Sequence, residues 1–123
     1  QCGRTDTNDV VSVTGTASDA NDVLYIPTDN TAASCAEAIK SAAKKPIIAG
    51  EEGICKGCGV ATLSIDYYEL GRTTGEMAVK ILKGEADIST MAIEYYPNPV
   101  KKYNPEMAEH FNLTIPSDYA AIG

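Results

Sequence analysis

The sequence predicts an α/β fold built on a mainly parallel β-sheet in three layers. Three short apolar segments have the length of strands, at residues 22–27, 46–50 and 60–65. Near-continuous apolar runs of this length are typical of strands that are buried on both faces, as in parallel sheets. Helix-forming segments alternate with these runs through short connections, and this alternation favours a layered α/β arrangement.

Apart from the strands, the first half of the chain contains one segment of ambiguous structure, one predicted helix and one predicted loop. The sequence does not predict a single structure for residues 8–18. Asn8 is a favourable helix cap, whereas the following Val, Thr and Gly residues weaken a helix. Residues 31–45 are rich in alanine and predict a helix that stops before Pro46. Residues 51–59 are interrupted by glycines and predict a loop.

The longest helix is predicted over residues 66–84. Asp66 is a natural N-cap, Glu69 stands where a capping box would place it, and Gly84 is a favourable stop. One face of this helix is apolar, as expected of a helix that packs against a partner. That face consists of Leu70, Met77, Ala78, Ile81 and Leu82.

Two further elements follow this helix. The apolar and aromatic run at residues 88–96 predicts a last strand. Residues 104–111 predict a short helix, with Asn104 as its cap and Pro105 in its first turn. The predicted order is therefore strand, helix, strand, strand, helix, strand, helix.

Polar residues follow three of the predicted strands at their carboxyl ends. Ligands of open parallel sheets gather beyond these ends, where helix N-termini also present free N–H donors. Carboxylates there suit an amine or several hydroxyls, and tyrosines suit a flat ligand body. The alternative is that Asn30 and Asp66 serve only as helix caps. The candidate ligand-binding residues are Thr28, Asp29, Asn30, Glu51, Glu52, Asp66 and Tyr67.

Composition and charge argue against several classes of function. The 123 residues suit one compact domain, and their net charge of −7 without a basic run argues against a nucleic-acid or anionic-membrane partner. No apolar window is long enough for a membrane span. The sequence begins without an initiator Met and without a visible signal peptide, so we expect a mature or trimmed product.

The cysteines and the histidine do not predict catalysis, a cofactor or a metal site. Cys55 and Cys58 form a C-x-x-C motif, but a glycine-flanked motif followed by a strand is the wrong context for a thioredoxin-like site. A zinc site needs about four ligands, and Cys2, Cys35 and His110 are scattered. We therefore expect a local disulfide or free thiols, with a small thiol-redox protein as the alternative. We interpret His110 as a solvated residue at a helix end.

Several motifs together resemble the substrate-binding proteins of ABC importers, especially those for tryptophan or tyrosine. The motifs are YIPTDN, AGEEG, ATLSIDYYELGRTTGEMAVKIL and NLTIP, and the resemblance extends over about residues 8–119. It implies a type I periplasmic-binding-protein-like fold, in which two α/β lobes hold a ligand in a cleft. Members of the family are considerably longer, so the resemblance also implies that residues 1–123 are a single segment from the C-terminal part of such a protein.

The resemblance implies non-covalent capture of an amino-acid-like ligand, aromatic ones included, without a chemical step. It assigns cleft-lining positions to Asp29, Asn30, Glu51, Asp66 and Tyr67. Asp29 or Glu51 would hold an ammonium group, backbone N–H groups near Asn30 would hold a carboxylate, and Tyr67 or Tyr68 would stack on a ring. It further implies an ABC transporter permease as partner, and an extracytoplasmic location as a lipoprotein or a periplasmic protein.

The helix over residues 66–84 has a separate implication. In the family it packs on the first lobe, so without that lobe its apolar face would need another cover. We expect an oligomer, a shifted helix or a partner fragment there. A second interpretation within the same fold is the effector-binding part of a transcriptional regulator. An upstream DNA-binding helix pair would favour the regulator, and a signal peptide with a lipid-accepting cysteine would favour the importer.

Overall fold

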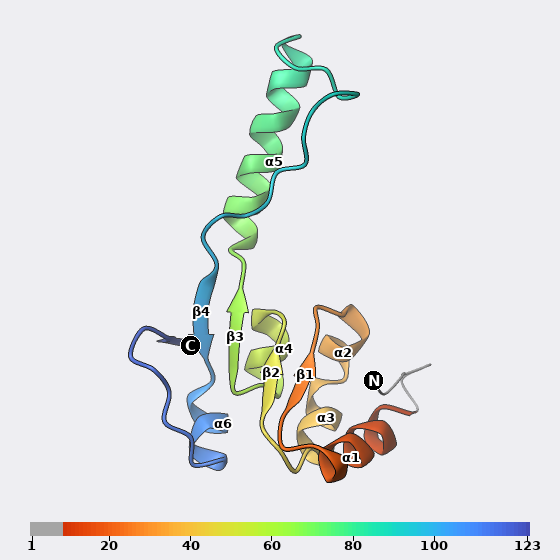
Figure 1. Cartoon of the computed structure of the whole chain (residues 1–123), viewed down its shortest axis with the longest axis vertical. Helices are drawn as coiled ribbons and strands as arrows, with labels where there is room; N and C mark the ends of the chain where they lie inside the picture. Colours follow the sequence, from red (N-terminus) through yellow and green to blue (C-terminus); the bar gives the residue numbers. More distant parts are fainter. Residues whose placement is uncertain (1–8) are drawn as a thin grey trace. The chain divides into compact units, whose positions relative to one another are not determined.

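The computed structural model describes residues 9–123, which contain a five-stranded sheet with strand order β1-β2-β3-β4-β5 (Figure 1). The chain divides into two compact units, one comprising the residues up to Ser64 together with Lys101–Gly123, and the other comprising Ile65–Val100. The elements are α1 (Val10–Ala20), β1 (Leu24–Ile26), α2 (Asn30–Ser34), α3 (Ala36–Ala42), β2 (Ile47–Ala49), α4 (Glu52–Gly57), β3 (Ala61–Ser64), α5 (Tyr67–Leu82), β4 (Val100–Tyr103), α6 (Pro105–His110) and β5 (Ala120–Ala121).

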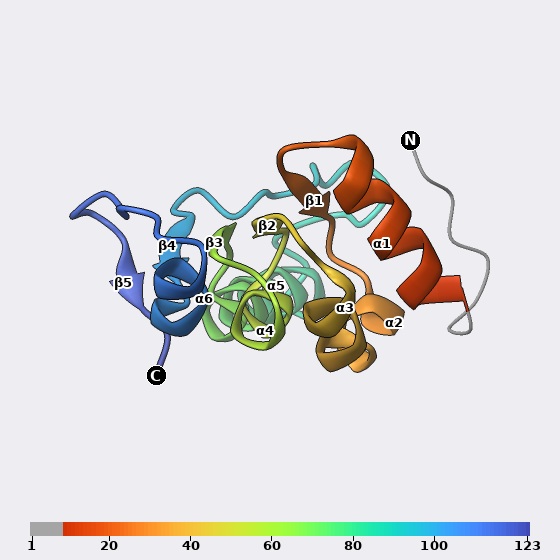
Figure 2. The ribbon, with the colours of Figure 1, turned by 90° about the horizontal axis from the view of Figure 1, so that it is seen from below.

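The predicted parallel sheet is confirmed, because β1, β2 and β3 pair in parallel. Right-handed crossovers that advance in one direction along a sheet place their helices on the same face. Figure 2 shows α2, α3 and α4 together on one side of β1–β3. On the opposite face of these strands Tyr25, Ile48 and Leu63 are exposed, whereas the residues that alternate with them in β2 and β3 are mostly buried.

The other side of the sheet completes the first unit. β4 runs opposite to β3 (Figure 1), and the N–H of Asn104, just after β4, donates to the carbonyl of Val60, just before β3, at 2.9 Å. β4 and β5 pair in parallel. The main apolar cluster lies between β1–β2 and the helices, with Ile39, Ile47 and Ile54 nearly or fully buried. A smaller cluster surrounds Val60, Met107 and Ala108.

Residues 10–20, where the sequence left the structure open, form the helix α1. Its buried residues Val10, Thr14 and Ser18 are spaced four apart, and α1 packs against α3. The Ser18 hydroxyl also accepts a hydrogen bond from the Lys44 N–H at 3.1 Å. Packing on α3 therefore outweighs the weak helix propensity of Val, Thr and Gly. The predicted cap Asn8 lies outside the described residues, and Asp9 stands at the N-cap position.

The prediction of one helix over residues 31–45 is wrong in one respect, because the segment contains two helices that meet at Cys35. No helix breaker marks this position, so local propensity gives no signal for the bend. The cause lies in tertiary packing: α2 packs against α4, whereas α3 packs against both α1 and α4. The two segments therefore need different axes.

The predicted loop at residues 51–59 is also wrong, because this segment contains α4. Glu51 caps the helix, and Ile54 and Cys55 are buried against the sheet, which compensates for the helix-weakening glycines. Gly57 has a packing role as well, since a Cβ built at this position would lie 2.4 Å from the Cβ of Ala36 in α3. The glycine that predicted a loop is thus a site of close contact between helices.

The predicted strand at residues 88–96 is wrong too, since this segment has no strand structure. Ile88, Ile93 and Tyr95 are all at least 75% exposed, so the apolar run finds no face to bury. Apolar residues alone do not make a strand without a neighbouring strand to pair with. The strands that follow residue 96 are β4, which contains two lysines, and the two-residue β5.

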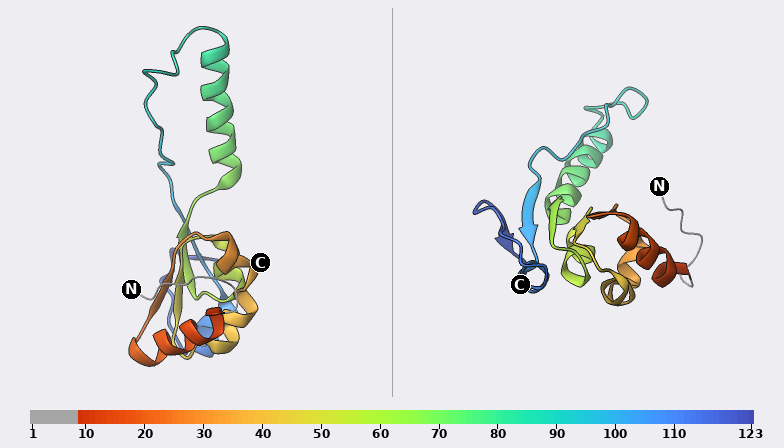
Figure 3. Two further views of the ribbon diagram at one scale, coloured as in Figure 1. Left: turned by 90° about the vertical axis from the view of Figure 1, so that its right-hand side faces the viewer. Right: turned by 60° about the horizontal axis from the view of Figure 1, so that its bottom comes forward.

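The second unit consists of α5 and the irregular chain that follows it (Figure 3). The predicted cap Asp66 and stop Gly84 are confirmed, the latter with φ of +73°, but Glu69 pairs with Arg72 instead of reaching back in a capping box. No residue of α5 is buried, and Leu82 on its apolar face is 86% exposed. None of the helices within residues 9–123 is long and apolar enough to cross a membrane.

Candidate functional site

The carboxyl ends of β1 and β2 lie side by side because the two strands are parallel. The Gly50 N–H donates to the Ile26 carbonyl at 2.7 Å, and the Thr28 hydroxyl donates to the Gly50 carbonyl at 3.3 Å. These two bonds tie together the loops that carry the predicted residues Thr28 to Asn30 and Glu51 to Glu52. The sequence placed these residues at one edge of the sheet, and the structure brings them there.

Asp29 is the N-cap of α2. The alternative role suggested by the sequence, in which Asn30 is the helix cap, is therefore taken by the neighbouring residue. The backbone of Asp29 is extended, and its Oδ1 accepts a hydrogen bond from the Ala32 N–H at 2.7 Å. Asn30 is instead the first residue of the helix and is exposed. An N-cap carboxylate also interacts favourably with the helix dipole. The side chain of Asp29 is thereby held in a fixed orientation at the end of β1.

Glu51 has the same role at the start of α4. Its carboxylate accepts hydrogen bonds from the N–H groups of Gly53, at 2.8 Å, and of Ile54. The neighbouring Glu52 pairs with Lys102 of β4 at 2.6 Å, and both side chains are partly exposed. Each carboxylate oxygen has two lone pairs, so a capping bond orients Glu51 without using up its acceptors.

The loops after β1 and β2, with Thr28 to Asn30 and Glu51 to Glu52, form a rim at this edge of the sheet. Gly50 also belongs to this rim, although it was not among the residues predicted from the sequence. A Cβ at this position would lie 2.6 Å from the backbone nitrogen of Thr28 and 2.9 Å from the carbonyl carbon of Pro27. Only glycine permits the two loops to approach so closely. The available signal was a glycine directly after a buried strand, which often marks close backbone approach. Nothing in the sequence marked Lys102 as the partner of Glu52.

Asp66 and Tyr67 belong to the second unit. The Asp66 Oδ1 accepts hydrogen bonds from the N–H groups of Tyr68 at 2.9 Å and Glu69 at 3.2 Å, which makes Asp66 the N-cap of α5. Tyr67 is 54% exposed and Tyr68 is 79% exposed. Their assignment to a binding site stays a prediction from the sequence.

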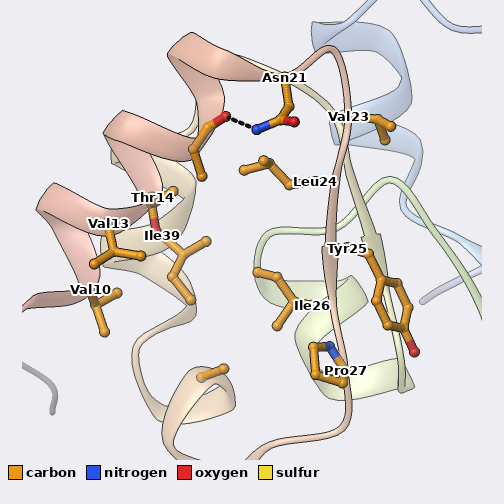
Figure 4. A pocket seen from close by; sticks show the side chains of 12 residues that line it. Val10, Val13, Thr14, Asn21, Val23, Leu24, Tyr25, Ile26, Pro27 and Ile39 are labelled. Atoms are coloured by element: carbon orange, nitrogen blue, oxygen red, sulfur yellow. Dashed lines mark hydrogen bonds between the residues drawn. The ribbon is translucent and has the colours of Figure 1, made fainter. Parts of the chain in front are cut away.

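The rim in the first unit is partly exposed and does not line either of two cavities in the described residues. The larger cavity has a volume of about 620 Å³ and lies between α1 and β1 (Figure 4). The smaller has a volume of about 290 Å³ and lies beside Lys40 and Glu106. None of the predicted binding residues lines either cavity. The rim alone is thus an open surface.

The C-x-x-C cysteines are free thiols, as is Cys35. Cys55 and Cys58 are buried in the main apolar cluster. Burial raises the pKa of the Cys55 thiol to about 12 and the pKa of the Cys58 thiol to about 11. The thiolate is the reactive form in redox chemistry, so two neutral buried thiols do not favour the thiol-redox alternative.

We expect iodoacetamide at pH 8 to modify Cys35 and to leave Cys55 and Cys58 unmodified in the folded protein. The test uses a Cys2→Ser variant, and peptide mass spectrometry locates each label. Unfolding in urea should make all three cysteines reactive, which serves as the control for reagent and detection. Native labelling of Cys55 or Cys58 at a rate similar to that of Cys35 would contradict the burial argument.

No group of three or more His, Cys, Asp or Glu side chains within residues 9–123 is arranged to hold a metal ion. His110 is the last residue of α6 and is exposed, with its ring edge-on to Phe111 at a centroid distance of 4.7 Å. This placement agrees with the interpretation of His110 as a solvated helix-end residue.

Three solved structures share this fold. A ligand-free, open substrate-binding protein with adhesive properties from Clostridium difficile is 33% identical, with a TM-score of 0.75 over 98% of this chain. An ABC domain from Streptococcus pneumoniae in complex with L-Trp is 27% identical, with a TM-score of 0.81 over 95% of this chain. A conserved domain protein from Vibrio cholerae is 29% identical, with a TM-score of 0.78 over 91% of this chain.

Sequence comparison agrees with these structures. A tyrosine-binding protein from Clostridioides difficile is 43% identical over 68 residues, which are 53% of this chain and 20% of that protein. The chain likewise spans only 42%, 42% and 38% of the three solved chains. The family model described as ABC transporter substrate binding protein matches residues 4–119. The chain therefore belongs to the family of ABC transporter substrate-binding proteins.

Proposed function

We propose that this protein captures an amino-acid-like solute for an ABC importer, by non-covalent binding in a cleft between two lobes. The family match over residues 4–119 carries the proposal. The L-Trp complex of one relative and the tyrosine-binding description of another support an amino-acid ligand. The relatives are binding proteins, so we propose no chemical step.

The rim at the ends of β1 and β2 is the ligand-binding surface that we propose for the first unit. Asp29 and Glu51 would accept charge-assisted hydrogen bonds from an ammonium group. Backbone N–H groups near Asn30, at the start of α2, would complement a carboxylate. The capping bonds already fix the carboxylates of Asp29 and Glu51, so little side-chain entropy is lost on binding. Thr28 and Glu52 border this surface.

For the second unit, Asp66 and Tyr67 stay proposed ligand contacts, with Tyr67 as a stacking surface for a ring. We also propose that the apolar face of α5 packs on the part of the family's fold that these 123 residues do not span. The exposure of Leu82 on this face supports this proposal. An ABC permease as partner and an extracytoplasmic location follow from the proposed role.

We expect weak, saturable binding of L-tryptophan or L-phenylalanine, with a Kd of about 1 mM or weaker, which corresponds to about −4 kcal/mol. The chain spans 42% of the L-Trp-binding relative, so contacts from the remainder are missing. Chemical-shift changes in a 15N-labelled sample should concentrate at residues 28–30 and 51–53. Submicromolar affinity would contradict the two-lobe proposal, and shift changes confined to other residues would contradict the rim.

Two variants test whether the charge of Asp29 contributes specifically to binding in this titration. Asp29→Asn keeps the capping ability of the side chain but removes its charge, so binding should weaken several-fold while the fold is retained. Asp19→Asn is the matched control, because Asp19 is an exposed carboxylate that pairs with Lys44 away from the rim. Equal weakening in both variants would show a general charge effect and not a specific contact.

A further inference from the structure

We infer that Lys102 of β4 recognises the carboxylate of an amino-acid ligand at the rim. It would thereby make the rim select zwitterionic amino acids over carboxamides and simple amines. This inference rests on the proposed function, because it assigns a specificity-determining residue to the same ligand-binding surface. Lys102 was not among the binding residues predicted from the sequence.

Lys102 reaches the rim through its ion pair with Glu52. The Lys102 Nζ lies 2.6 Å from the Glu52 Oε2, although Lys102 is on β4 and Glu52 is the first residue of α4. Four other lysines in the described part of the first unit pair with carboxylates outside the rim. These pairs are Lys40–Glu106, Lys44–Asp19, Lys45–Asp22 and Lys101–Asp118. Lys102 therefore differs from them in placing a positive charge beside the rim carboxylates.

The ion pair leaves Lys102 able to bind a ligand. A lysine ammonium has three N–H donors, and the bond to the Glu52 Oε2 uses one of them. The side chain of Lys102 is 31% exposed and that of Glu52 is 39% exposed, so solvent reaches both groups. A ligand carboxylate can therefore accept a hydrogen bond from Lys102 while the bond to Glu52 stays intact.

The neighbouring Glu51 supplies the partner for the ligand's ammonium group. The ammonium and the carboxylate of an amino acid are attached to one carbon atom, so their partners on the protein must also be adjacent. Glu51 and Glu52 are consecutive, and the N–H groups of Gly53 and Ile54 hold the Glu51 carboxylate in place. An ammonium at Glu51 and a carboxylate at Lys102 satisfy this requirement, because Lys102 is bound to Glu52.

The positive charge of Lys102 gives a selectivity that neutral donors do not give. A backbone N–H, such as those near Asn30, donates both to a carboxylate and to the oxygen of a carboxamide. An ammonium favours the carboxylate, because that hydrogen bond is charge-assisted on both sides. The carboxylates of Glu51 and Glu52 attract any amine and repel a ligand carboxylate. Without Lys102 this surface should therefore favour amines that lack a carboxylate.

Titrations of the 15N-labelled chain with L-tryptophan and L-tryptophanamide test this inference. The amide replaces the ligand's carboxylate by a neutral group, and at pH 6 both ligands carry an ammonium, since an α-amino group has a pKa of about 7.7. In Lys102→Met, the Kd for L-tryptophan should rise about threefold or more. The Kd for the amide should stay the same or fall, because a like charge has been removed. A disturbed fold would instead weaken the binding of both ligands.

Three further variants control for net charge and for folding. Lys101→Met is the matched control, because it removes the same charge from the preceding residue, which pairs with Asp118 away from the rim. It should leave the ratio of the two Kd values nearly unchanged. Lys102→Arg retains the charge and should retain the preference for L-tryptophan. Lys102→Gln keeps a neutral donor for Glu52, should lose the preference, and is the decisive variant if Lys102→Met does not fold.

The outcomes distinguish this inference from the proposed function. L-tryptophan binding at residues 28–30 and 51–53, with the preference lost only in the neutral Lys102 variants, supports both. The same binding with equal ratios of Kd in the wild type, Lys102→Met and Lys101→Met would overturn the role of Lys102 and leave the rim as the ligand site. An equal loss of preference in Lys101→Met and Lys102→Met would overturn it as a general charge effect. Absence of L-tryptophan binding at the rim would overturn the rim and this inference together.

Discussion

Replacing Asn104 by aspartate is expected to lower the free energy of unfolding by about 3 kcal/mol at pH 7. Asn104 is 8% exposed, and its Nδ2 donates to the carbonyls of Cys55 at 3.2 Å and Lys56 at 3.0 Å. Its Oδ1 accepts from the Met107 N–H at 3.3 Å and so caps α6. Aspartate keeps the cap, but it removes both donors and turns an oxygen toward the two carbonyls.

This loss of stability should depend on pH. A carboxyl group buried against two carbonyl oxygens favours its protonated form, so its pKa in the folded variant should exceed the value of about 3.9 for an unfolded aspartate. Ionisation then favours unfolding above the unfolded pKa, and the loss is largest above the folded pKa. It should shrink as the pH falls toward the unfolded pKa, because the protonated acid can donate one hydrogen bond.

Urea denaturation of the wild type and the variant at pH 7 and pH 4.5 measures the loss of unfolding free energy and its pH dependence. At each pH the value for the variant is subtracted from that for the wild type, which removes the pH dependence common to the two proteins. The matched control is Asn98→Asp, an exposed position where we expect a change within about 0.5 kcal/mol. A similar small change at Asn104, or a loss that grows on acidification, would contradict the buried contacts that we describe.

Asn104 also shows how far the sequence predicts this fold. Its role as a cap followed from Asn-Pro before a helix-forming segment, a local pattern that needs no knowledge of distant residues. Its bonds to Cys55 and Lys56 could not be predicted, because residues 51–59 were interpreted as a loop. The glycines there weaken a helix locally, but the burial of Ile54 and Cys55 against the sheet outweighs that preference.

In the candidate site, too, local features were predictable from the sequence, whereas contacts between distant residues were not. Strand ends and their polar residues were predictable, because parallel strands align their carboxyl ends whatever covers the sheet. The partners of these residues were not predictable: Lys102, which pairs with Glu52, lies on a strand that the sequence does not predict. The prediction of a strand at residues 88–96 was wrong because it also depended on a distant partner. An apolar run forms a strand only when a neighbouring strand exists to pair with it.

Replacing Gly50 by alanine should have a comparably large effect, with a loss of about 2–4 kcal/mol in the free energy of unfolding. The new Cβ would lie 2.6 Å from the Thr28 nitrogen and 2.9 Å from the Pro27 carbonyl carbon. Both are backbone atoms, so no rotamer change relieves the contact. The ends of β1 and β2 must separate, which weakens the bonds from Gly50 to Ile26 and from Thr28 to Gly50.

Two other glycines provide controls for this variant in urea denaturation. A Cβ at Gly53 would meet only the Glu51 carboxylate, at 3.1 Å, and a side chain can shift. A Cβ at Gly15 would meet nothing within 4 Å, so Gly15→Ala in α1 should stabilise by about 0.5–1 kcal/mol. If Gly50→Ala were as mild as Gly53→Ala, the two loops would not be in close contact. Asp29 and Glu51 would then lack the backbone bonds that hold their helix caps at one edge of the sheet.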